Sequence, residues 1–174
     1  MKLGLLASLF LSALLSAAAV TEWPVYLRRA GPVRIGMSLA EVRRVLGDPR
    51  ARLEGITPEE LDSCAYLKSG VVPKHLGFMF AKGRVVRIDV SGAGIRTASG
   101  AGVGDTEDRI KQQYPNRIRV EPHHYLPETG HYLIYSPQDA SDSPFGMVFE
   151  TEAGKVASFR VGTQDAIALV EGCS

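Results

Sequence analysis

Residues 36–47 read GMSLAEVRRVLG and decide how the predicted fold begins. Ser38 and Glu41 have the spacing of a capping box, in which each side chain bonds the backbone amide of the other residue. Apolar side chains then recur at helical spacing until Gly47 ends the pattern. We therefore predict a helix over residues 38–46.

A second stretch, residues 104–115, reads GDTEDRIKQQYP and aligns with the first. Gly104 falls on the first glycine and Thr106 falls on the capping serine, although Arg109 replaces the partner carboxylate. The pattern predicts a helix over residues 106–114. Two such stretches indicate a degenerate internal repeat.

A β-hairpin is predicted after each helix. The outgoing strands contain residues 77–80 and 146–149, and the turns fall at residues 82–83 and 151–154. The returning strands alternate at period two, which assigns one side to the core. The side chains predicted to face the core are Val86, Ile88, Val90, Ala157, Phe159 and Val161. Those predicted to point away are Arg87, Asp89, Ser158 and Arg160.

Two more elements are predicted between these blocks. Residues 57–61 read TPEEL, which is typical of a short helix with Thr57 at its cap and Pro58 in its first turn. Residues 131–135 read HYLIY, and this aromatic and β-branched composition predicts a strand.

The predicted fold class is α+β: two repeated modules, each a helical segment followed by antiparallel β-strands. Module 1 covers residues 20–92 and module 2 covers residues 103–174. Residues 93–102 are rich in glycine and small side chains, so we interpret them as the linker between the modules.

This plan resembles the tandem modules of the β-lactamase inhibitory protein fold, and a single copy resembles the related small bacterial envelope lipoproteins. The resemblance rests on residues 36–42, on Leu46-Gly47 and on the hairpins around Gly83 and Gly154. It implies a protein-binding function, which is inhibition in the first case and support of outer-membrane assembly in the second. It carries over no site residues, because this chain has no lipid-acceptor cysteine and no cysteine pair within either copy.

Residues 1–19 have the pattern of a secretory signal peptide. Lys2 supplies the positive start, residues 3–15 are mostly apolar, and the small residues 17–19 fit a cleavage site after Ala19. The alternative is an uncleaved anchor, but the apolar stretch is shorter than the ~20 residues of a spanning helix. We therefore predict an exported protein, periplasmic or secreted, with no stable membrane insertion after cleavage.

The cysteines and the charges further limit the possible covalent structure and the possible partners. An even number of cysteines in an exported chain predicts a disulfide between Cys64 and Cys173, with free thiols or an intermolecular bond as alternatives. Without Lys2 the 20 basic residues become 19, which equals the 19 acidic residues. Because nucleic acids are bound by clustered basic side chains, this balance and the interspersed charges argue against a nucleic-acid partner.

One cluster of polar and aromatic side chains stands out, because three of the four histidines fall within residues 121–131. A zinc site would need converging donors such as Glu121, His123 and His131, but their spacing matches no established ligand pattern. Side chains with apolar faces and polar tips are frequent at recognition surfaces. We predict a binding surface formed by His123, His124, Tyr125, His131 and Tyr132; the alternative is that these are ordinary side chains of a loop and an edge strand.

No catalytic, cofactor-binding or metal-ligating residue is predicted. The sequence has no Gly-x-Ser-x-Gly motif, and Gly102-Val103-Gly104 follows no clear strand and lacks the third glycine of a dinucleotide site. The leading hypothesis is an exported, non-enzymatic binding module whose partner is another protein. The alternatives are a small-molecule or sugar-binding, lectin-like module and a hydrolase of unfamiliar type.

Overall fold

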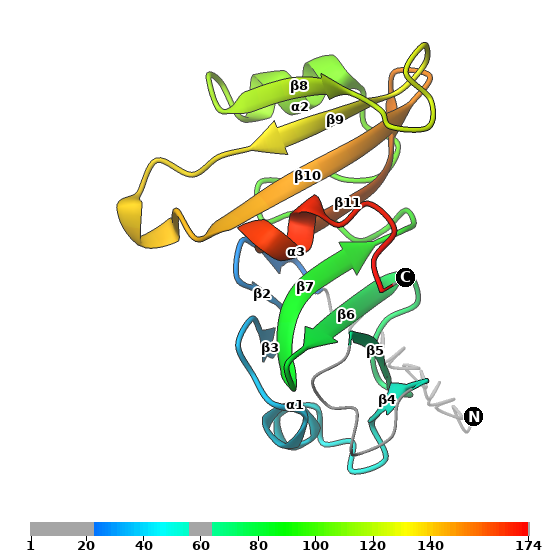
Figure 1. Cartoon of the computed structure of the whole chain (residues 1–174), viewed down its shortest axis with the longest axis vertical. Coiled ribbons are helices and arrows are strands. Elements are labelled where there is room, and N and C mark those ends of the chain that lie inside the picture. Colours follow the sequence, from blue (N-terminus) through cyan, green and yellow to red (C-terminus); the bar gives the residue numbers. More distant parts are fainter. Residues whose placement is uncertain (1–22, 56–63, 174) are drawn as a thin grey trace, which may run out of the picture.

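An antiparallel sheet of eight strands forms the centre of the structure, a computed structural model that describes residues 23–55 and 64–173 (Figure 1). From one edge to the other its strands are β4 (Arg52–Glu54), β5 (Ala65–Lys68), β6 (Leu76–Ala81), β7 (Arg84–Val90), β11 (Lys155–Thr163), β10 (Phe145–Glu152), β9 (His131–Tyr135) and β8 (Ile118–Pro122). The pairing of β7 with β11 joins the two halves of the chain into this one sheet.

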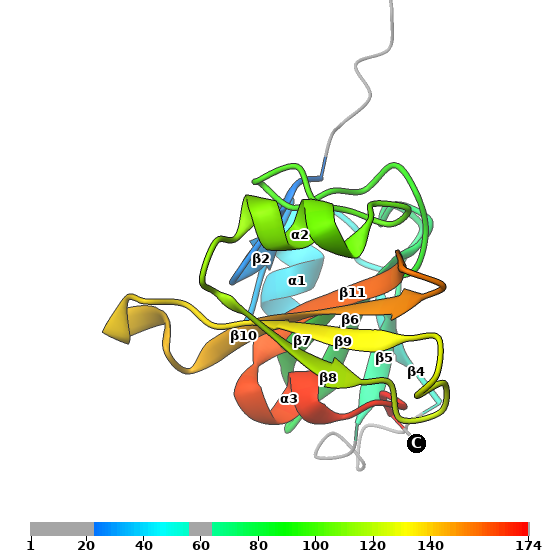
Figure 2. The same ribbon diagram turned by 90° about the horizontal axis from the view of Figure 1, so that it is seen from above.

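Helices cover both faces of the sheet, but unequally. Helices α1 (Leu39–Leu46) and α2 (Glu107–Gln113) lie on one face, and α3 (Gln164–Ala168) lies on the other (Figure 2). The remaining elements are a small sheet of β1 (Val25–Tyr26), β2 (Arg29–Ala30) and β3 (Val33–Arg34), and a 3-10 turn at Ala140–Asp142.

The predicted fold class is wrong. In the described residues the protein is mostly β, with antiparallel sheets of three and eight strands and only three short helices, so it is not a helix-then-strand α+β repeat. The sequence pattern overstated the helices because capping motifs are conspicuous even where the helix has only 8 or 7 residues. It understated the strands because β1 to β5 have two to four residues each, too few for a period-two pattern.

The local predictions for the two helices are confirmed. The Ser38 hydroxyl accepts the backbone N–H of Glu41, and the Glu41 carboxylate accepts the backbone N–H of Ser38 at 2.8 Å. The Thr106 hydroxyl accepts the backbone N–H of Arg109 at 3.2 Å, without a return bond from that residue. These caps satisfy amides that have no partner inside the helix.

The aligned glycines before the helices make equivalent contacts. The Gly36 N–H donates to the carbonyl of Val85 at 2.7 Å, and the Gly104 N–H donates to the carbonyl of Val156 at 2.8 Å. Both glycines have φ near +90°, a region that other residues rarely adopt. Each helix therefore starts from a fixed point beside its returning strand.

Both hairpins are confirmed, but the predicted core face is wrong at one position in each. The β6–β7 register shifts between Met79 and Phe80, where Val86 is an extra residue in β7, and the β10–β11 register shifts between Glu150 and Thr151, where Ala157 is an extra residue in β11. An extra residue on one strand changes which returning side chains face the core. The returning core side chains are Val85, Ile88, Val90, Val156, Phe159 and Val161, in place of the predicted Val86 and Ala157.

The main core lies between the sheet and helices α1 and α2. Val42 and Ile110 project from these helices and are fully buried against Phe78, Phe149 and Phe159 of the sheet. The segment predicted as a linker contributes to the same core through Ala101, and Thr97 in it is also buried. The predicted signal peptide and the predicted helix over residues 57–61 lie outside the described residues.

None of the helices in the described ranges has the length and apolar character needed to cross a membrane.

Candidate functional site

We call the sheet face opposite α1 and α2 the open face (Figure 2). It carries charged side chains because strand residues alternate, and the alternate positions fill the core on the other side. Residues 164–173, which we call the C-terminal cover, lie over part of this face and comprise α3 and the segment after it (Figure 1). The cover contacts β7, β10 and β11.

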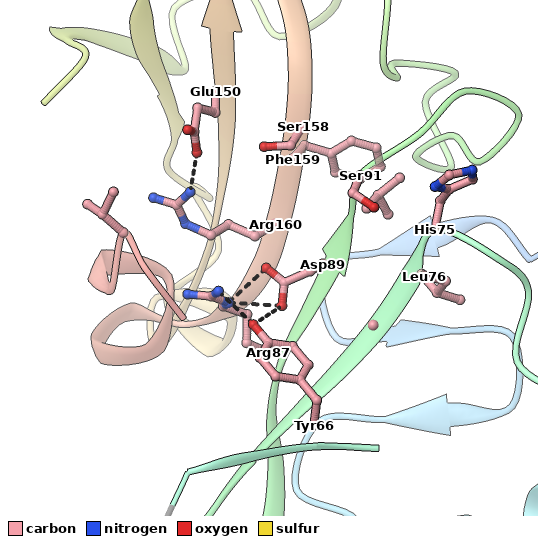
Figure 3. Close-up of a pocket in the computed structure, with 13 residues that line it drawn as sticks. Tyr66, His75, Leu76, Arg87, Asp89, Ser91, Glu150, Ser158, Phe159 and Arg160 are labelled. Carbon is pink, nitrogen blue, oxygen red and sulfur yellow. Dashed lines mark hydrogen bonds and ion pairs between the residues drawn. The ribbon is translucent and has the colours of Figure 1, made fainter. Parts of the chain in front are cut away.

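The first charged group on the open face is Arg87, whose side chain is only 4% exposed. Its Nε is 2.9 Å from Asp89, and its Nη2 donates to the Tyr66 hydroxyl at 3.0 Å (Figure 3). Its Nη1 donates to the carbonyls of Ala166 at 2.9 Å and Leu169 at 2.6 Å. Arg87 is thus neutralised by a carboxylate and also bonds two carbonyls at the end of α3, of which that of Ala166 additionally accepts the backbone N–H of Leu169 at 3.4 Å.

Tyr66 completes this network as a hydrogen-bond donor. Its hydroxyl donates to Asp89 at 3.0 Å. Burial raises the pKa of Tyr66, and the negative charge of Asp89 raises this pKa further. The phenol therefore stays protonated at neutral pH and cannot act there as a base.

The second charged group is Arg160, whose side chain is 7% exposed. Its Nη1 lies 2.9 Å from Glu150, and its Nε donates to the carbonyl of Ile167 at 2.7 Å. The same carboxylate lies 2.8 Å from Nε2 of His123, whose ring stacks on Tyr132 at 4.7 Å between centroids. Both buried arginines therefore bond the C-terminal cover and a carboxylate of the sheet.

Two grooves flank the cover on the open face, and Arg160 and Val170 line both. The central groove has a volume of about 380 Å³ and contains Tyr66, Asp89 and Ser158 (Figure 3). The lateral groove has a volume of about 390 Å³ and lies between α3 and β8, over the side chains of Tyr132, Ile134 and Val148. The first groove is polar and the second has an apolar floor.

The central groove is lined by side chains that can form hydrogen bonds. Ser91, Ser158 and His75 all line the central groove (Figure 3). The described residues contain no hydrogen bond between either serine hydroxyl and His75. Within the same ranges, no group of three or more His, Cys, Asp or Glu side chains is placed to hold a metal ion.

Of the residues predicted to form a binding surface, His123 has a structural role. It is 6% exposed, and its Nδ1 accepts the backbone N–H groups of Tyr125 and Leu126, both at 3.1 Å. Since Nδ1 accepts these bonds, Nε2 carries the proton and donates to Glu150. His123 therefore fixes the start of the β8–β9 loop.

The remaining predicted residues do not share one surface. Tyr132 is 7% exposed, and its hydroxyl accepts the backbone N–H of His124. His131 lies on the opposite face of the sheet, where its Nδ1 is 2.8 Å from Glu107 of α2. His124 and Tyr125 are exposed beside the open face, and the Tyr125 hydroxyl donates to Glu171 in the C-terminal cover. Only these two are accessible there.

The charged residues of the open face were not among the predicted site residues. The period-two pattern had placed Arg87, Asp89 and Arg160 away from the core, so the sequence contained a signal for them. It contained none for Tyr66 or Glu150, because their partners Arg87 and His123 are 21 and 27 residues away in the chain.

The predicted disulfide between Cys64 and Cys173 is confirmed, and it attaches the cover to the residue before β5. Close packing at this attachment requires glycine at position 172, where φ is +71° and a Cβ would lie 2.8 Å from the Tyr66 hydroxyl. A disulfide is consistent with an exported protein, because such bonds persist in oxidising compartments.

A scan against protein-family models and searches of curated proteins and of solved structures returned no match.

Proposed function

We propose that this protein is an exported, non-enzymatic binding module that holds a partner protein on the open face. The observation that carries the proposal is the pair of buried arginines, Arg87 and Arg160, fixed beside the two grooves. Tyrosine and arginine are enriched at protein interfaces, and groups held in place before binding lose little entropy on association. An oxidising location, the periplasm or the exterior, fits the disulfide.

The margin of the open face supports the same function. Tyr125 is 56% exposed and Leu169 is 47% exposed, and Leu169 belongs to the cover while Tyr125 bonds it. Of the predicted surface, His124 and Tyr125 belong to this proposed interface. Because both arginines are already paired with carboxylates, the partner meets little net charge, and we expect the binding to depend weakly on salt.

A small polar ligand such as a sugar is the second candidate. The central groove favours it, because its volume of about 380 Å³ falls in the range of small-molecule sites and hydroxyl and charged groups line it. The two candidates differ in the area that a ligand covers: a protein would contact the cover as well as both grooves.

Site-specific photocrosslinking tests the protein partner. A photoreactive amino acid replaces Ser158 in the central groove, Leu169 on the cover or, as the control, Asp108 on α2, whose side chain is 86% exposed. The protein is expressed in the organism that exports it and irradiated. We expect the same discrete protein adduct from positions 158 and 169 and none from position 108.

Two outcomes would contradict this function. Equal adducts from all three positions would mean unspecific contact, and the absence of any adduct would contradict the hypothesis of a protein partner. In the second case, protection of the central groove by added sugars in hydrogen exchange would favour the sugar-binding alternative.

A further inference from the structure

Strand β8 lies at the end of the sheet and pairs only with β9 in the described structure (Figure 1). The backbone of an edge strand presents N–H and C=O groups that can bond another strand.

The register of β8 decides the outward groups. The carbonyl of Arg117 accepts the N–H of Ser136 at 3.1 Å, and the N–H of His123 donates to Gly130 at 3.0 Å. Bonding residues alternate along an antiparallel strand, so the odd-numbered residues between them also bond β9. Ile118 and Val120 therefore direct both backbone groups outward.

The position of Pro122 fits this alternation of residues that bond β9 and residues that point outward. It falls at an outward position, where the missing N–H of proline costs no bond within the sheet. Proline also limits how far another strand can pair along the edge, because its carbonyl can accept a bond but it has no N–H to donate. The free edge is consequently short.

The side chains of β8 are self-complementary. Arg119 and Glu121 lie on the open face, form an ion pair, and have side chains that are 63% and 44% exposed. Val120 points to the other face and is 42% exposed. An opposite pair of charges on either side of one residue matches its own copy when two such strands run antiparallel.

We propose that β8 pairs antiparallel with β8 of a second copy of this chain, about a two-fold axis at Val120. Val120 then exchanges two backbone hydrogen bonds with the partner's Val120, and the N–H of Ile118 donates to the carbonyl of the partner's Pro122. Arg119 stands opposite the partner's Glu121, and the reverse pair forms by symmetry.

Within Ile118–Pro122, charge favours this register over its neighbours. A slip of two residues in one direction places Arg119 opposite the partner's Arg119, and a slip in the other direction places Glu121 opposite the partner's Glu121. Like charges directly opposite each other destabilise a strand pair. Because the axis is perpendicular to the sheet, the open faces of both copies lie on the same side of one continuous sheet.

Charge reversal followed by sedimentation velocity tests the proposal with the disulfide-bonded protein. We expect concentration-dependent dimerisation of the wild type, and about tenfold weaker association for Arg119→Glu and for Glu121→Arg alone, since each converts two attractive pairs into repulsive ones. An equimolar mixture of the two variants should associate again, because the acidic strand of one matches the basic strand of the other. Arg52→Glu on β4, at the opposite edge, is the control and should dimerise like the wild type.

A backbone variant gives a second test. Val120→Pro removes an N–H that points outward, so the sheet keeps its bonds while the dimer loses its central ones; thermal unfolding followed by circular dichroism checks that the fold is intact. A wild type that stays monomeric at every soluble concentration overturns the proposal. So does a mixture of the charge variants that associates no better than either alone.

Discussion

The two faces of the sheet bury different chemistry. Between the sheet and helices α1 and α2 the buried cluster is apolar, with Phe78, Phe149 and Phe159 at its centre. On the open face the buried side chains include Arg87 and Arg160. The first face depends on filling volume, whereas the second depends on hydrogen bonds that the two arginines donate to carbonyls of the C-terminal cover.

The largest effect is expected from a cavity on the helix side. Phe149 is fully buried and lies against Tyr114 and Phe159, with ring centroids at 5.9 and 5.5 Å. Phe149→Ala should lower the free energy of unfolding by about 4 kcal/mol, which denaturant unfolding measures. Val120→Ala, on the same face but partly exposed, should change it by less than about 1 kcal/mol. Equal losses would mean that the helix side is not packed as described.

The next effect comes from unpairing a charge on the open face. Arg87→Met removes the cation that is paired with Asp89 and the donor to two carbonyls of the cover, and should cost about 3 kcal/mol. The double variant Arg87→Met with Asp89→Asn should recover part of this loss, because no unpaired charge remains. Arg84→Met serves as the control, since its side chain is 63% exposed. If the double variant is no more stable than the single one, the pairing of Arg87 with Asp89 does not explain the cost.

Opening the disulfide should produce a smaller and more local effect. Replacing Cys64 and Cys173 by serine should lower the free energy of unfolding by about 2–3 kcal/mol, because the unfolded chain gains freedom. Hydrogen exchange should accelerate more in residues 164–173 than in β9 and β10, where only the lower global stability acts. Equal acceleration throughout the sheet would show that the cover and the sheet unfold as one unit.

The smallest effect concerns acid stability at the contact between α2 and β9. Although partial burial opposes it, hydrogen bonds from Thr151 and His131 hold the pKa of Glu107 below its ordinary value of 4.5. A lowered pKa in the folded state contributes stability above pH 4.5, and this contribution is lost as the pH falls through the folded-state pKa. Glu107→Gln should therefore cost about 1 kcal/mol at neutral pH, with the difference from wild type vanishing in acid.

The control for this titration is Asp108→Asn on the same helix, whose side chain is 86% exposed. It should change the stability equally little at every pH. A Glu107→Gln difference that persists below the pKa of Glu107 would mean that the contact, and not its charge, stabilises the helix.

Local rules predicted the parts of the fold that involve near neighbours. Ser38 and Glu41 are three residues apart, and the hydrogen bonds between them depend on nothing else in the chain. The core position of Val85 could not be predicted in this way, because the bulge at Val86 in the same strand sets it. Nor could the role of Arg87, whose carbonyl partner Ala166 is 79 residues away.

One error in the predicted site could have been avoided from the sequence. Residues 131–135 were predicted to be a strand, and adjacent strand residues point to opposite faces. His131 and Tyr132 could therefore not lie on the same surface, and the structure places them on opposite sides. Similarity of side-chain type does not bring together residues that alternate across a strand.

The C-terminal cover also imposes an order in time. A chain is synthesised from its N-terminus, so β7 exists long before the residues that accept the hydrogen bonds of Arg87. Until those residues arrive, the guanidinium groups of Arg87 and Arg160 remain hydrated and Cys64 has no partner. Folding can therefore finish only after residues 164–173 have been synthesised. When this segment docks, it removes water from Arg87 and Arg160 and allows the disulfide between Cys64 and Cys173 to form.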